Sequence, residues 1–175
     1  MRTHRLVLGV ALLAVLAGLA TPGLKAAPAT TVTVEIDDLG PWTGFYNVDP
    51  LAFRASGIRL ASDYVVGFSN GHAVLSGWAS NTPPFMIAAS FTRPVSSVSA
   101  SIRMHVQGTA DYTLTAYAAS GKLIGSSTIT LSQDGLDGNF YTVSLDNLPI
   151  KAKSFTLLGG LDYGVKSISY SYGQS

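Results

Sequence analysis

The segment Gly67-Phe68-Ser69-Asn70-Gly71 has the G-x-S-x-G spacing that holds a nucleophilic serine on a sharp turn between a strand and a helix. Such a serine needs an acid and then a histidine further along the chain. No Asp or Glu lies between Ser69 and His105, which is the last histidine of the chain. The catalytic order therefore cannot be built. Asn70-Gly71 instead predicts a tight hairpin turn, because both residue types accept positive φ.

The segment from Glu35 to Gly40, EIDDLG, approaches the E-x-D-x-x-E pattern of retaining jelly-roll glycoside hydrolases. That chemistry needs two carboxylates about 5 Å apart, one as nucleophile and one as proton donor. Gly40 stands where the second acid would be, and Glu35 is the only glutamate in the chain. The segment is therefore predicted to be a strand that ends in an acidic turn, without catalytic activity.

Metal chemistry has only weak support in this sequence. Oxygen ligands for calcium could come from two predicted loops, one with Asp37 and Asp38, the other with Asp134, Asp137 and Asn139. This leaves room for a structural calcium ion, and no other cofactor is expected. His72 and His105 lack a partner at the spacing that a zinc site uses. His105 is expected to face solvent on its strand.

Aromatic side chains beside amides and carboxylates are the remaining candidates for chemistry. A flat ring can hold the apolar C–H face of a sugar while a neighbouring polar group binds its hydroxyls. The predicted ligand-binding residues lie in two loops: Trp42, Tyr46, Asn47 and Asp49 in the first, and Trp78 in the second. The alternative is that both tryptophan rings fill the ends of the fold. Tyr170 and Tyr172 share one strand face and are assigned to the core or the sheet surface.

Strict alternation of apolar and polar residues predicts the elements that must position these groups. Val98, Ala100, Ile102, Met104 and Val106 fall on one face of a strand, and the serines between them, with Arg103 and His105, fall on the other. About ten short strands are expected. They are Thr31–Ile36, Leu51–Leu60, Tyr64–Phe68, His72–Trp78, Phe85–Phe91, Val95–Val106, Tyr112–Ala118, Lys122–Leu131, Phe140–Leu145, Ser154–Leu158 and Val165–Tyr172. Because no helix follows residue 30, the predicted fold is an all-β antiparallel sandwich of the jelly-roll type.

The first 29 residues are typical of a secretory signal peptide, with Arg2 and Arg5 before an apolar run and small residues near a cleavage site. A single domain at 30–175 and a secreted or periplasmic location follow. Of the 11 Lys and Arg residues, three lie in the leader, which leaves eight against 10 acidic residues and a formal charge of −2. Nucleic-acid binding is therefore disfavoured. The absence of cysteine excludes disulfides, thiolate metal sites and a lipoprotein anchor.

Two segments, Phe91–Ser99 (FTRPVSSVS) and Leu114–Ser126 (LTAYAASGKLIGS), resemble a jelly-roll β-sandwich found in many exported bacterial proteins. Some of those proteins carry PEP-CTERM sorting tails, and the domains are similar in architecture to carbohydrate-binding modules. Their closing strand has the form Phe-Gly-Ile-Asp-Asn-Ile-Ser, which corresponds here to Tyr163–Ser169, with Lys166 in place of the aspartate. No sorting tail is present, so the resemblance implies release rather than tethering.

The sequence therefore predicts a secreted, non-catalytic module that binds carbohydrate, with polysaccharide as the expected partner. The alternative is a structural or adhesive component of an envelope or matrix that self-associates or binds a protein. Its basis is the low content of charged residues, 12%, which leaves little repulsion between copies. An enzyme is the third interpretation, because jelly rolls also host hydrolases and lyases.

Overall fold

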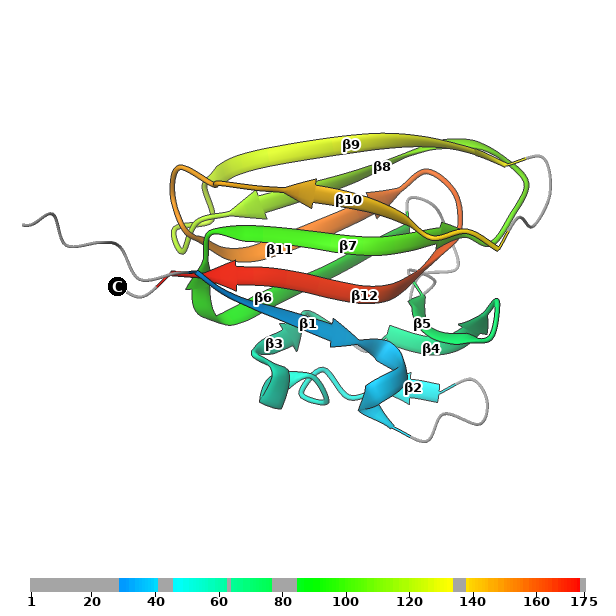
Figure 1. Ribbon diagram of the computed structural model, residues 1–175, viewed down its shortest axis with the longest axis horizontal. Helices are drawn as coiled ribbons and strands as arrows, with labels where there is room; N and C mark the ends of the chain where they lie inside the picture. Colours follow the sequence, from blue (N-terminus) through cyan, green and yellow to red (C-terminus); the bar gives the residue numbers. More distant parts are fainter. Residues whose placement is uncertain (1–28, 41–45, 63, 77–84, 134–137, 174–175) are drawn as a thin grey trace, which may run out of the picture.

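The predicted alternation produces two antiparallel sheets that pack face to face (Figure 1). The computed structural model describes residues 29–40, 46–62, 64–76, 85–133 and 138–173. The expected signal peptide lies outside these residues, apart from Ala29. The predicted antiparallel sandwich is confirmed, with twelve strands among the described residues in place of about ten. No helix in the described part of the chain is long and apolar enough to cross a membrane.

The larger sheet, sheet A, has seven strands, and β12 lies in its interior. β12 pairs with β7 along one side and with both β1 and β5 along the other. The order is β10-β7-β12-β5-β4-β2, with β1 joined to β12. The bounds are β1 Thr30–Glu35, β2 Tyr46–Val48, β4 Tyr64–Ser69, β5 His72–Ser76, β7 Ser97–Met104, β10 Tyr141–Leu145 and β12 Tyr163–Tyr172.

The smaller sheet, sheet B, has five strands in the order β3-β6-β11-β8-β9 and lies behind sheet A in Figure 1. Its bounds are β3 Ile58–Leu60, β6 Phe85–Val95, β8 Gly108–Tyr117, β9 Leu123–Gln133 and β11 Ala152–Gly159. Two short 3₁₀ turns, η1 Ile36–Leu39 and η2 Arg54–Ser56, follow β1 and precede β3.

The core lies between the two sheets and is filled by the alternating inward side chains of both. Val98, Ala100 and Ile102 of β7 are at most 1% exposed, as the sequence pattern predicts. Tyr163 is fully buried, donates its hydroxyl hydrogen to the Leu157 carbonyl at 2.6 Å and packs edge-on against Tyr112. Since the chain has no cysteine, this apolar burial supplies most of its stability.

Three strand predictions are wrong in detail. The predicted strand Leu51–Leu60 is a turn followed by η2, and only its last three residues form β3. The predicted strand Val95–Val106 is divided at Ser96, whose N–H donates to the Ser171 carbonyl, so that β6 ends and β7 begins there. Tyr46–Val48, which the sequence predicts to be part of a loop, forms the short strand β2. Local hydrogen bonds, such as Ala52 N–H to the Asp49 carbonyl, form the turn before η2, whereas pairing with distant residues determines the break at Ser96 and the formation of β2.

The predicted Asn70-Gly71 hairpin is confirmed, with φ of 49° and 78° at the two turn residues. This hairpin, β4 with β5, belongs to sheet A and folds over the outward-facing side of β7 and β12. Ser69 Oγ accepts a hydrogen bond of 2.6 Å from Arg103 Nη1 on β7. Asn70 Nδ2 donates to the Gly138 carbonyl at 2.8 Å. Arg103 is therefore only 7% exposed, and its predicted place on a solvent-facing surface is wrong.

Gly164 on β12 allows this close approach of the hairpin. A Cβ atom at this position would lie 2.6 Å from Val74 Cγ2 and 2.7 Å from His105 Nε2. Val74 is fully buried although it is directed away from the core between the sheets. Val74 of the hairpin thus packs closely against the outward-facing side of β12 at Gly164.

Candidate functional site

Two of the five predicted ligand-binding residues, Trp42 and Trp78, lie outside the described residues. The backbone of Tyr46 pairs with Val66 in β2 and β4. Asn47 and Asp49 are exposed and line a shallow cavity of about 390 Å³ together with Val48 and Pro50. The Asp49 carboxylate accepts the Leu51 N–H at 2.7 Å, so this side chain also begins the turn that leads to η2. The predicted aromatic loop stays a prediction.

A second region of polar and aromatic side chains lies where η2, β6, β1 and β12 meet, at the lower left of Figure 1. It is a cavity of about 290 Å³, which we call the tyrosine cavity. Its described lining is Val32, Arg54, Ala55, Ser56, Gly57, Thr92, Arg93, Tyr170 and Tyr172. This set combines aromatic rings, guanidinium groups and hydroxyls, the combination that recognises a polyhydroxylated ring.

Tyr170 forms the floor of the tyrosine cavity. Its ring packs against Phe91 at 5.1 Å between centroids, and its hydroxyl donates to the Ser56 carbonyl at 2.6 Å. Burial raises the pKa of Tyr170, the neighbouring Tyr172 adds to this effect, and Arg93 opposes it. The Tyr170 hydroxyl is therefore a fixed structural donor that ties η2 to β12.

Tyr172 is half-buried at the mouth of the tyrosine cavity. The guanidinium carbon of Arg93 lies 5.6 Å from the centre of its ring, and the Tyr170 ring is 6.3 Å away. Arg93 itself is exposed. The mouth thus holds the Tyr172 ring together with the exposed Arg93 guanidinium, a hydrogen-bond donor that lies over one face of that ring. The predicted assignment of both tyrosines to the core or the sheet surface is confirmed, because Tyr170 is 6% exposed and Tyr172 is partly buried against the core.

Gly57 determines how closely η2 approaches Tyr170. Its φ is +80°, and a Cβ atom there would overlap the Tyr170 hydroxyl. The Gly57 carbonyl also accepts the Thr92 N–H at 2.9 Å, which joins η2 to β6. Only glycine satisfies both the backbone conformation and the close contact.

A neighbouring cavity of about 420 Å³ shares Arg54 and Thr92 with the tyrosine cavity, and we call it the arginine cavity. Its described lining is Leu51, Arg54, Arg59, Ser90, Phe91, Thr92 and Lys153. Lys153 Nζ donates to the Thr92 carbonyl at 2.9 Å. Arg59, opposite Ser90 in the β3–β6 ladder, alternates with the buried Ile58 and Leu60, so it is directed away from the core. The two cavities therefore run from the end of the sandwich onto the outer face of sheet B.

The serine of the G-x-S-x-G segment is not arranged as a nucleophile. Ser69 is 6% exposed, and its hydroxyl accepts from Arg103, with no hydrogen bond to His72 or His105 among the described residues. The expectation that His105 faces solvent is also wrong. Its Nδ1 lies 3.4 Å from Asp162 Oδ2, and its Nε2 is buried without a hydrogen-bond partner.

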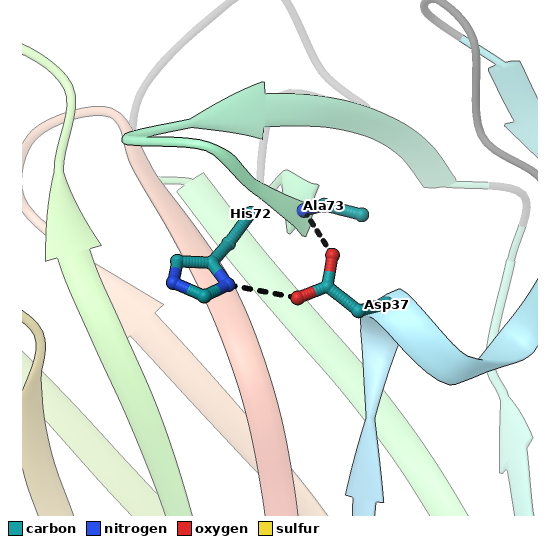
Figure 2. A network of polar contacts seen from close by, with 3 residues as sticks. All are labelled: Asp37, His72 and Ala73. Carbon is teal, nitrogen blue, oxygen red and sulfur yellow. Dashed lines mark hydrogen bonds and ion pairs between the residues drawn. The ribbon is translucent and has the colours of Figure 1, made fainter.

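Both oxygens of Asp37 are used within the protein (Figure 2). Oδ2 lies 2.8 Å from His72 Nδ1, and Oδ1 accepts the Ala73 N–H at 2.6 Å. Asp37 therefore holds the start of η1 against β5. Within the described ranges no group of three or more His, Asp or Glu side chains could hold a metal ion. Asp134 and Asp137, from the second predicted calcium loop, lie outside those ranges.

The Asp37 contact makes stability depend on pH in the acid range. Burial alone raises the pKa of this carboxyl, but hydrogen bonds from His72 and Ala73, with the charges of His72 and Lys166, lower the pKa below its usual 3.8. Because the folded pKa is below the unfolded value, the carboxylate stabilises the fold above about pH 4, and this is lost as pH falls further. We expect Asp37→Asn to lower the urea midpoint at about pH 5 and to match the wild type at about pH 2.

Asp38→Asn is the matched control, since this neighbouring carboxylate is exposed and makes none of these contacts. An Asp37→Asn protein that loses stability equally at both pH values would show that the carboxylate charge is not involved.

No motif or periodic pattern in the sequence indicates the two cavities. Arg54, Arg93 and Tyr172 are separated by 39 and 79 positions in the chain and meet only through the pairing of β1 with β12 and of β3 with β6. Arg93 belongs to the FTRP segment that carries the family resemblance, and the sequence predicts for Tyr172 only a place on the same strand face as Tyr170. Periodicity predicts which face a side chain occupies, but not which distant side chain stands beside it.

No protein-family model matches this sequence, and no curated protein matches it either. Among solved structures, the chain is similar to a family 29 carbohydrate-binding module from Piromyces equi, with 13% identity over 83% of this chain and 91% of that one, at a TM-score of 0.49. It is also similar to a family 6 module from Clostridium stercorarium in complex with cellobiose, with 14% identity, 79% and 92% coverage and a TM-score of 0.35.

A third likeness is to the family 32 module of NanJ from C. perfringens in complex with galactose, with 14% identity, coverage of 82% and 93% and a TM-score of 0.39. At these identities the likeness concerns the fold and not individual side chains.

Proposed function

We propose that this chain is an exported, non-catalytic module that binds polysaccharide at the tyrosine cavity. The observation that supports this most directly is the half-buried ring of Tyr172 at the mouth, with the Arg93 guanidinium 5.6 Å from its centre. A sugar ring presents an apolar C–H face to an aromatic surface and hydroxyls to neighbouring donors. Arg54, Arg93 and Thr92 supply those polar groups around the mouth.

The predicted aromatic loop extends this proposal. Asn47 and Asp49 line their own shallow cavity, and the chain runs directly from Pro50 there to Leu51, which lines the arginine cavity. Trp42, Tyr46 and Trp78 remain predicted contacts for a polymer that continues beyond the tyrosine cavity. A polymer of several sugar units matches such a row of shallow cavities better than a small enclosed ligand does.

The test is affinity electrophoresis of residues 30–175 through gels that contain neutral or acidic polysaccharides, followed by calorimetry with those that retard the protein. We expect Tyr172→Ala to lower the affinity at least about tenfold, equivalent to ~1.4 kcal/mol, and Tyr172→Phe to preserve it. Phe68→Ala is the control, because Phe68 is a large exposed aromatic residue on β4, away from the cavity.

The proposal fails if no polysaccharide in the panel retards the wild type, or if Tyr172→Ala binds as tightly as the wild type. Trp42→Ala tests the loop separately. An affinity equal to that of the wild type removes Trp42 from the binding site.

Self-association is the second candidate function, and one strand favours it. β9 is an edge strand of sheet B, and its 11 residues, LIGSSTITLSQ, include no charged side chain. Long uncharged edges can pair with a second chain. Sedimentation velocity tests this function: a dimer that Thr128→Lys converts to monomer supports it, and a monomer at all concentrations excludes it.

A further inference from the structure

The positive charge of this chain is concentrated around the proposed binding site. The described residues include eight Lys and Arg side chains, and four of them line the tyrosine cavity or the arginine cavity: Arg54, Arg59, Arg93 and Lys153. No described carboxylate lines either cavity. The local charge is therefore strongly positive, although the predicted mature chain is slightly negative overall.

No carboxylate of the described residues forms an ion pair with any of these four cations. The ion pairs among the described residues are His72–Asp37 and His105–Asp162, and neither includes any of the four. Arg93 lies over the Tyr172 ring, and Lys153 binds a neutral carbonyl. Arg54 and Arg59 are exposed. Like charges held close together repel one another, so a ligand that brings negative charge gains attraction from all four.

The arrangement of the cations fits a polymer rather than a single anion. Arg93 and Arg54 line the tyrosine cavity. Arg54 also lines the arginine cavity, together with Arg59 of β3 and Lys153 of β11. Ser90 and Thr92, on the same outer face of β6, supply hydroxyls between them. A guanidinium group binds a carboxylate or a sulfate through two parallel N–H donors.

We propose that the ligand of this site is an acidic polysaccharide, with uronic carboxylates or sulfate esters bound along the arginine cavity while a sugar ring contacts Tyr172. This inference rests on the proposed function and specifies its ligand class. It gives each cavity a distinct role, because the tyrosine cavity recognises the sugar and the arginine cavity recognises its charge.

The first experiment compares polymers that differ only in charge. Wild-type protein is titrated with polygalacturonate and with its methyl-esterified form, and separately with dextran sulfate and dextran. We expect each charged polymer to bind at least about tenfold more tightly than its neutral partner, and the difference to shrink as salt is raised. The carboxylate and sulfate pairs show which group the site prefers.

The second experiment compares variants that differ only in where charge is removed. The double variant Arg59→Ala/Lys153→Met is expected to bind the charged polymer about tenfold more weakly while its affinity for the neutral partner is unchanged. Lys122→Ala/Lys151→Met removes the same net charge at two exposed lysines that line neither cavity, and we expect it to bind as the wild type does. Thermal melting confirms that both doubles are folded.

The outcomes separate the two proposals. Equal binding of charged and neutral polymers, with a loss in Tyr172→Ala, overturns the acidic ligand and leaves the polysaccharide function in place. Equal losses of affinity in the two double variants also overturn the acidic ligand. The preference for charged polymers would then come from the charge of the whole protein and not from the arginine cavity. Tighter binding of a single-stranded oligonucleotide than of either acidic polysaccharide overturns the ligand class. No binding to any polymer overturns both proposals.

Discussion

Tyr163→Ala is expected to lower the free energy of unfolding by about 3–5 kcal/mol, a large part of the ~5–15 kcal/mol that a domain of this size possesses. The Tyr163 side chain is fully buried, and its ring contacts Tyr112 at 5.4 Å between centroids. A Cβ at Gly159 would lie 2.6 Å from the same ring, so the surroundings are already closely packed. Truncation removes these contacts and leaves a cavity that the two rigid sheets cannot close. Urea denaturation followed by circular dichroism measures the loss.

Tyr163→Phe separates the ring from its hydroxyl. This variant retains the packing and loses only the hydrogen bond to the Leu157 carbonyl, so a loss of about 1 kcal/mol is expected. A Tyr163→Ala protein within about 1 kcal/mol of the wild type would contradict the packing described for the core.

Gly57→Ala is expected to have the second largest effect, a loss of about 2–4 kcal/mol together with weaker polysaccharide binding. Two terms contribute. The φ of +80° is strained for alanine, and the new methyl group overlaps the Tyr170 hydroxyl that binds the Ser56 carbonyl. Relief of this overlap requires η2 to move away from β12, which widens the tyrosine cavity. Denaturation and calorimetry measure the two consequences.

Gly71→Ala is the matched control for the backbone term. Gly71 has nearly the same φ, +78°, but an added Cβ there meets nothing within 4 Å. A loss of about 1 kcal/mol is expected for this variant, with unchanged binding. In the Tyr170→Phe background the penalty of Gly57→Ala is expected to fall toward that of Gly71→Ala. If the two glycine variants lose equal stability in the wild-type background, the contact with Tyr170 has no energetic role.

The sequence was sufficient for the fold class because period-two patterns are local. The alternation from Val98 to Met104 and the Asn70-Gly71 turn are both present in the structure, the latter with φ of 49° and 78° at its two residues. The sequence could not show that the β4–β5 hairpin folds over the polar face of β7. Arg103 and His105 follow the polar half of the alternation correctly, yet the β4–β5 hairpin covers the face to which they belong.

The candidate site was harder to predict for a related reason. Its side chains come from η2, β3, β6, β11 and β12. None of these segments has a sequence pattern that indicates a binding site on its own. Arg54 lies in the predicted strand Leu51–Leu60. An arginine in such a strand indicates only a solvent-exposed position. Only the turn begun by Asp49 and the 3₁₀ geometry of η2 bring it beside Tyr170.

The interior position of β12 determines the order in which this chain can fold. β1 pairs with β12 across more than 130 residues, from Thr30 with Tyr172 to Glu35 with Ser167. On a ribosome, β1, β5 and β7 therefore emerge long before the strand that joins them. Contacts of such long sequence separation require costly chain closure, which places folding in the slow range of milliseconds to seconds. A nascent chain of this protein remains without a complete sheet A until its last strand has been synthesised.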